Sequence, residues 1–77
     1  MTIENTTTLD TSGLNCPLPI LKTKKAINIL AAGDMLQVIA TDPGSVKDIS
    51  SFCQQTGHEL VETSESGGKF NFLIRKH

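Results

Sequence analysis

A cysteine followed directly by a proline, Cys16-Pro17, is the feature of this sequence with the clearest chemical use. Proline is favoured at the first position of an α-helix because it has no N–H to leave unpaired and its φ is already helical. We therefore expect Pro17 at the first helical position, Cys16 at the N-cap and Pro19 within the first turn. A thiolate at a helix N-terminus is stabilised by the helix dipole and by unpaired amides, so its pKa falls. The pattern predicts an exposed, nucleophilic thiol at Cys16.

Two other interpretations of the cysteines stay open. Cys16 could simply cap the helix, although serine, threonine, asparagine and aspartate cap helices better than a thiol does. Cys53 shares one helical flank with Val46 and Ile49, which predicts a buried and inert side chain. If Cys53 were instead a resolving thiol for Cys16, the two would form a redox couple, but they lack the C-x-x-C spacing.

Asp10 and Asp42 each end a predicted strand, at the edge of the sheet where the following helix begins. Either carboxylate could approach the thiol there. The interpretation that we prefer is that each supports the turn that follows it, as aspartates commonly do. Neither has a histidine partner that would complete a nucleophile, base and orienting group, which disfavours a hydrolase or protease. His58 is interpreted as a structural residue at the start of a strand.

Basic residues form two groups, Lys22, Lys24 and Lys25 in the first predicted helix and Arg75 with Lys76 at the C-terminus. Such groups are usually solvated surface. The alternative is that they raise the potential around a thiolate or persulfide, or bind an acidic partner.

Length and composition limit the classes of function. A chain of 77 residues predicts one domain, residues 1–77 with an ordered core over about 9–76, too small to enclose a substrate cavity. The net charge of -1 argues against direct binding of nucleic acid. Without an apolar span or a basic, apolar leader, we expect a cytoplasmic protein with free thiols that does not engage a membrane. The two histidines lack metal-ligand spacing, so no metal is expected.

Apolar periodicity and turn residues predict the element order βαβαββ. The expected strands are Thr6–Thr11, Met35–Thr41, His58–Ser66 and Lys69–Lys76, and the expected helices are Pro17–Ala32 and Ser45–Thr56, closed by Gly33 and Gly57. Strand 35–41 is apolar on nearly both faces and should be central. We expect Ser45 and Asp48 to form a capping box. The fold class is α+β, a mixed four-stranded sheet with two helices on one face.

The motif around the cysteine resembles the signature of the TusA/SirA-like family of small sulfur-carrier proteins. The matching motif is Leu9-Asp10-x-x-Gly13-Leu14-x-Cys16-Pro17-x-Pro19. The later matching blocks are Gly33-Asp34, Ala40 to Ser45, Asp48-Ile49, Phe52-Cys53, Gly57 to Leu60 and the tail Phe72 to Lys76, which is similar to TusA proper. The resemblance extends from about Leu9 to Lys76, over nearly the whole chain.

The resemblance implies a two-layer α/β sandwich and a sulfurtransferase without a metal or organic cofactor. In the family, the cysteine of the motif accepts sulfane sulfur from a cysteine desulfurase, holds it as a persulfide and passes it to a downstream relay protein. The resemblance assigns that role to Cys16. The residues expected to support the cysteine are Pro17, Pro19, Gly13 and Asp10. In TusA proper the sulfur serves 2-thiolation of the wobble uridine of transfer RNA, and in relatives it serves molybdenum-cofactor synthesis or sulfur oxidation.

The active loop departs from TusA proper at Asn15 and Leu18, where that protein has a basic and an acidic residue. The loss of the cation removes one stabiliser of a thiolate, and Leu18 makes the surrounding surface more apolar. These changes bear on the choice of partner. We expect a monomer, since a relay protein needs its thiol face free. An alternative class is a regulatory or interaction module without sulfur chemistry.

Overall fold

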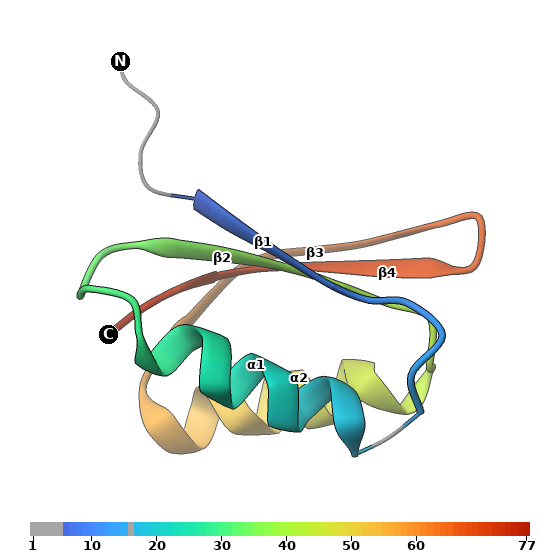
Figure 1. Ribbon diagram of the computed structural model, residues 1–77, viewed down its shortest axis with the longest axis horizontal. Coiled ribbons are helices and arrows are strands. Elements are labelled where there is room, and N and C mark those ends of the chain that lie inside the picture. The colour runs from blue at the N-terminus through green and yellow to red at the C-terminus, as the bar shows by residue number, and fades with distance from the viewer. Residues whose placement is uncertain (1–5, 16) are drawn as a thin grey trace.

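The computed structural model describes residues 6–15 and 17–77, so the predicted N-cap Cys16 lies outside the described residues. The elements follow the order β1 (Thr6–Thr11), α1 (Leu18–Asn28), β2 (Met35–Ala40), α2 (Gly44–Thr56), β3 (Glu59–Ser66) and β4 (Lys69–Arg75). Figure 1 shows two layers, with both helices beneath the sheet. The predicted order βαβαββ and the two-layer arrangement are confirmed.

The sheet has the strand order β1-β2-β4-β3, which places β2 and β4 in the interior and β1 and β3 at the edges. β1 runs parallel to β2, with Leu9 opposite Val38, because a helical crossover joins them. β4 is antiparallel to both β2 and β3. The mixed four-stranded sheet with a central second strand is therefore as predicted.

Alternation along the strands directs one row of side chains onto the helices. On β2, Leu36, Val38 and Ala40 are fully buried, while the residues between them are half-buried. Their partners Phe72 and Ile74 on β4 continue the same face. The helices complete the core with Ile27 from α1 and with Ile49, Phe52 and Cys53 from α2.

A tight turn joins β3 to β4 at Gly67 and Gly68, whose φ angles are 58° and 82°. Positive φ at both central residues is the requirement of a type I′ hairpin turn, which glycine meets without strain. The predicted Gly67-Gly68 hairpin is confirmed. β3 carries a register irregularity between Leu60 and Glu62.

The first helix differs from its prediction at both ends. It begins at Leu18, so Pro17 is the N-cap and not the first helical residue that the sequence predicted. Pro19 occupies the second helical position. It ends at Asn28 rather than at residue 32. The physical reason for the early end is that the amide of Ala31 donates to Asp34 Oδ2 at 3.1 Å instead of to a helical carbonyl.

The second helix begins one residue early and lacks the predicted capping box. Its N-cap is Pro43 and no side chain caps it. Ser45 lies inside the helix, where its Oγ donates to the carbonyl of Asp42 at 2.6 Å. Val46 is 42% exposed, so its predicted place on the buried flank is wrong. The predicted end is confirmed, because Gly57 takes φ of 86° and donates to the carbonyl of Cys53.

Candidate functional site

The loop from β1 to α1 is held in place by short hydrogen bonds. Asp10 Oδ1 accepts from the amide of Ser12 at 2.9 Å, and Leu14 N donates to Thr11 O at 3.1 Å. Gly13 has φ of 83°, and its amide donates to Thr41 Oγ1 at 2.9 Å. The last contact ties the loop to the end of β2, so the segment that leads to α1 has a defined path.

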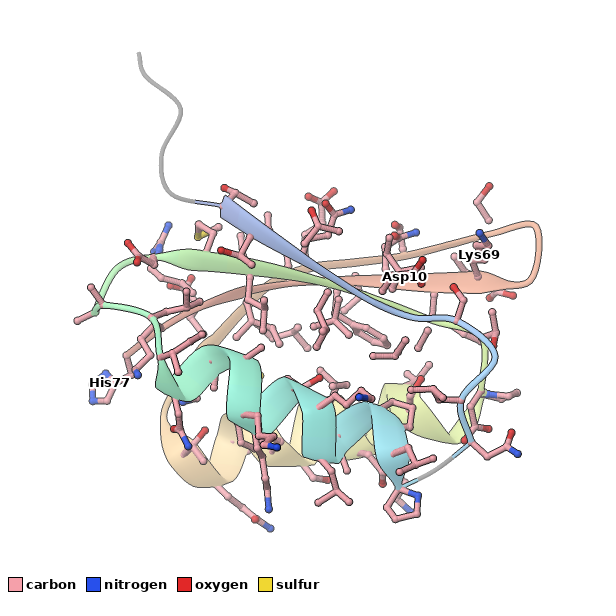
Figure 2. All side chains as sticks on the ribbon, viewed as in Figure 1. Asp10, Lys69 and His77 are labelled. Atoms are coloured by element: carbon pink, nitrogen blue, oxygen red, sulfur yellow. The ribbon has the colours of Figure 1, made fainter. Side chains whose placement is uncertain are left out.

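Asp10 serves the turn that follows it. The hydroxyl and then the amide of Ser12 lie against its carboxylate and lower its pKa, and the charge of Lys69 adds to this effect. Figure 2 shows Asp10 and Lys69 on the side of the sheet away from the helices. Asp42 likewise supports the turn that follows it, since its Oδ1 accepts a hydrogen bond from the amide of Gly44 at 3.2 Å. Both carboxylates follow the turn interpretation that we preferred from the sequence.

The beginning of α1 offers few amide donors. Leu18 N donates to Asn15 O at 2.8 Å, and Pro19 has no N–H. Two of the first three helical positions therefore have no amide hydrogen left for an anion, fewer than the sequence interpretation assumed. Pro19 is buried, and its carbonyl accepts from the buried Thr23 Oγ1 at 2.8 Å. The helix dipole still places positive potential at this end.

The surface around the beginning of α1 is exposed and partly apolar. Asn15 and Pro17, the two chain neighbours of Cys16, are both exposed. Leu18 is 45% and Leu21 49% exposed. Exposed leucines close together on a small protein are typical of a contact surface for another protein.

A groove of about 350 Å³ runs between α1 and α2 from this same end. It is lined by Pro17, Ile20, Lys24, Asp48, Ser51, Phe52 and Gln55. The lining combines apolar side chains with one cation and one carboxylate, a mixture that suits a protein surface better than a small apolar ligand. The groove begins at the residue that follows Cys16.

The structure divides the lysine cluster predicted for α1. Lys24 lines the groove against α2, whereas Lys22 and Lys25 line a second groove against β1. The predicted basic pair at the C-terminus has structural partners of its own. Arg75 forms an ion pair with Glu59, and the side chain of Lys76 bonds to carbonyls at the end of α1. Sequence pattern could not reveal these contacts, because the partners are far apart in the chain.

Cys53 is buried, as predicted, at 4% exposure on the core side of α2. Burial raises the pKa of its thiol, because the charged form would lose its hydration. A protonated thiol in the core is a poor nucleophile. The structure thus gives Cys53 the setting of a packing residue.

His58 joins the chain end to α2. Its Nδ1 accepts from the amide of His77 at 2.9 Å, and its ring lies 5.5 Å from that of Phe52. Burial, and then the charges of Lys76 and His77, lower the pKa of His58. These contacts fit the structural role that the sequence favoured.

Over residues 6–15 and 17–77, no three metal-ligating side chains come together. In the same part of the chain, no helix has the length and apolar character needed to cross a bilayer.

Comparison with solved structures finds the same two-layer α+β fold in another small protein. A solved structure of a SirA-like protein from Desulfitobacterium hafniense superposes with a TM-score of 0.78 over 88% of this chain and 93% of that one, at 24% identity. The family model described as sulfurtransferase TusA matches residues 7–76. The chain belongs to the TusA family of sulfurtransferases.

Several curated relatives carry the name sulfur carrier protein TusA, and two of them show the degree of similarity. The protein from Allochromatium vinosum is 65% identical over 68 residues, which cover 88% of this chain and 90% of the relative. The protein from Pseudomonas putida is 48% identical over 68 residues, which cover 88% of this chain and 85% of the relative. Membership of this family supports sulfur transfer between a donor and an acceptor as the general activity.

Proposed function

We propose that this protein carries sulfane sulfur as a persulfide on Cys16, accepting it from a cysteine desulfurase and passing it to a relay protein. The observation that carries the proposal is the exposure of Asn15 and Pro17 on either side of Cys16, at the positive end of α1. The family of sulfur carriers gives that exposed segment its chemistry.

The transfer needs no oxidant or cofactor. The Cys16 thiolate attacks the outer sulfur of the donor's persulfide, the donor's S–S bond breaks, and the donor cysteine leaves as a thiolate. In the second step an acceptor thiolate attacks the outer sulfur of the Cys16 persulfide. The S–S bond on Cys16 breaks, and Cys16 leaves as a thiolate. The dipole of α1 favours the anionic form of Cys16 before and after each step.

The surface next to Cys16 suits a macromolecular substrate. The exposed Leu18 and Leu21 and the groove that begins at Pro17 provide a contact area for a protein that brings its own persulfide. Gly13 and Pro19 hold the ends of the segment through their contacts with Thr41 and Thr23. We assign them and Asp10 a positioning role.

We further propose that the sulfur is destined for 2-thiolation of the wobble uridine of transfer RNA in the cytoplasm, through downstream relay proteins. The tail Phe72 to Lys76, which is similar to TusA proper, supports this destination. The name of the relative at 65% identity supports sulfur carriage in general. Molybdenum-cofactor synthesis and sulfur oxidation are the competing destinations. Asn15 and Leu18 are the positions that we expect to bear on partner choice, because both are exposed beside Cys16.

The test follows radioactive sulfur from labelled cysteine, through a cysteine desulfurase, to the protein. Wild-type protein and Cys53→Ala should retain reductant-labile label, and Cys16→Ser should retain none. If Cys16→Ser, folded by circular dichroism, still took up label or still supported transfer RNA thiolation in cells, the carrier proposal would be wrong. Preserved biological activity without label would identify a regulatory module instead.

A further inference from the structure

A second groove lies on the other flank of α1, against the edge strand β1. It holds about 520 Å³, and the residues that line it are Leu9, Lys22, Lys25, Ala26, Asn28 and Ile29. Its floor is apolar, and Ile29 is 85% exposed, a large aliphatic side chain left in water. Lys22 and Lys25 stand one turn apart on its helical side. An apolar floor with a basic wall selects an acidic, partly apolar partner.

β1 offers an unprotected sheet edge beside this groove. In the strand order β1-β2-β4-β3, the backbone of β1 pairs with β2 on one side only. Proteins usually protect such edges with charges, prolines or bulges. Over Thr6–Thr11, β1 has no proline and no register irregularity, and its one charged residue, Asp10, lies on the face of the sheet away from the helices.

The opposite edge of the sheet is protected, which makes the contrast informative. β3 carries Glu59, Glu62 and Glu65 and has a register irregularity after Leu60. Both features discourage the addition of another strand. Among the described residues, β1 is therefore the less protected of the two sheet edges.

We propose that the groove between β1 and α1 binds an extended acidic segment of a partner protein, added as a strand along β1. Alternate residues of the added strand would face α1, about 7 Å apart. That spacing is close to the 5–6 Å between side chains one turn apart on a helix, so two carboxylates can reach Lys22 and Lys25. Neighbouring apolar residues of the segment cover Leu9, Ala26 and Ile29.

Charge also argues against a second copy of this chain as the occupant. Pairing of two β1 strands about a two-fold axis would bring Lys22 and Lys25 of each copy together, and like charges in close contact are unfavourable. Pairing of β1 with β3 of another copy would join the open edge to the protected one and would continue as a filament.

The inference goes beyond sulfur transfer and does not require the thiol. Ile29 and Pro17 lie at opposite ends of α1, which spans about 16 Å. A partner held in this groove therefore leaves the Cys16 end and the groove against α2 accessible. This arrangement would let one partner stay bound while another exchanges sulfur.

The test uses the full-length Cys16→Ser protein, labelled with nitrogen-15, and a synthetic eight-residue peptide. In the peptide, every second residue is threonine, and the four positions between hold two glutamates and then two valines. A matched peptide carries lysine in place of each glutamate. The acidic peptide should shift the amide signals of Thr6–Thr11 and of Lys22–Ile29 in a saturable manner. The lysine peptide should leave them in place.

Two neighbouring charge reversals distinguish the groove from general electrostatic attraction. Lys25→Glu should weaken peptide binding about three- to fivefold, as expected for loss of a partly exposed pair, whereas Lys24→Glu, on the other flank, should have little effect. The proposal would be overturned if both variants lost the same affinity for the acidic peptide, or if the lysine peptide bound equally well. It would also be overturned if the amide signals shifted on another surface, or did not shift at millimolar peptide. Concentration-dependent self-association through β1 would also overturn it, in favour of a second copy.

Discussion

The side chain of Lys76 closes the C-terminal end of α1, where its Nζ lies 2.9 Å from the carbonyl oxygen of Ile27. The same ammonium group lies 3.1 Å from the carbonyl oxygen of Leu30. The backbone of Lys76 is fixed as well, because its carbonyl accepts from Gly33 and its amide donates to Asp34. The C-terminal tail therefore sets the end of the helix whose other end follows Cys16.

Replacement of Lys76 by methionine should destabilise the fold by about 1–2 kcal/mol, since it removes charge-assisted hydrogen bonds from carbonyls at a helix C-terminus. Urea unfolding measures the change. Lys47→Met, at an exposed position of α2, is the matched control and should change the stability by less than about 0.5 kcal/mol. Equal effects of the two substitutions would mean that the Lys76 contacts contribute nothing.

The stability should fall in mildly acidic solution because of His58. Its folded pKa lies below the ordinary value of 6.5, so the fold favours the neutral ring, which accepts the His77 amide at Nδ1. This contribution is complete above the unfolded pKa and is lost as the pH falls through the folded one. The urea midpoint should therefore drop between about pH 7.5 and pH 5.5.

His58→Gln should show a smaller drop over the same interval. His77→Gln should keep most of the drop, because the bond uses the backbone of His77 and the charge of its side chain is the smallest cause of the lowered pKa of His58. Proton NMR of the ring of His58 gives its pKa directly. A value at or above the ordinary one would contradict the account.

Cys53→Ala should lower the free energy of unfolding by roughly 1–2 kcal/mol, because the smaller side chain leaves a cavity in the core. Sulfur uptake should persist, since the thiol is buried and its pKa is raised. Urea unfolding and desulfurase-dependent labelling measure the two effects. A folded Cys53→Ala protein that cannot carry sulfur would show that Cys53 takes part in the relay.

Substitutions of Asp10 distinguish a turn residue from a catalytic group. Asn at this position can still accept the amide of Ser12, so Asp10→Asn should keep stability and sulfur uptake near those of the wild type. Asp10→Ala should lower the free energy of unfolding through loss of that bond. If both substitutions abolished uptake in folded protein, the charge of Asp10 would have a direct chemical role.

Local patterns were sufficient to predict the sheet. The alternation of Leu36, Val38 and Ala40 fixes which face of β2 is buried, and Gly67-Gly68 fixes the hairpin. The order of elements then limits the topology to a parallel crossover followed by a hairpin. Cys53 could be placed in the core because its neighbours on one helical flank are apolar.

The end of α1 could not be predicted locally, because contacts of Asp34 and Lys76 decide it and Lys76 lies 46–49 residues away along the chain. The three lysines of α1 are exposed, as the preferred interpretation predicted. Their division between two grooves was not predicted, although residues one and two positions apart point to different flanks of a helix. Lys24 therefore faces α2, while Lys22 and Lys25 face β1.

The central claim is tested most directly by intact mass and peptide mapping after the reduced protein is incubated with a cysteine desulfurase and cysteine. The account predicts a gain of one sulfur atom, confined to the peptide that contains Cys16 and removed by reductant. The account would be contradicted if the desulfurase loaded another acceptor but added no sulfur to this protein. It would also be contradicted if the added sulfur were found on Cys53.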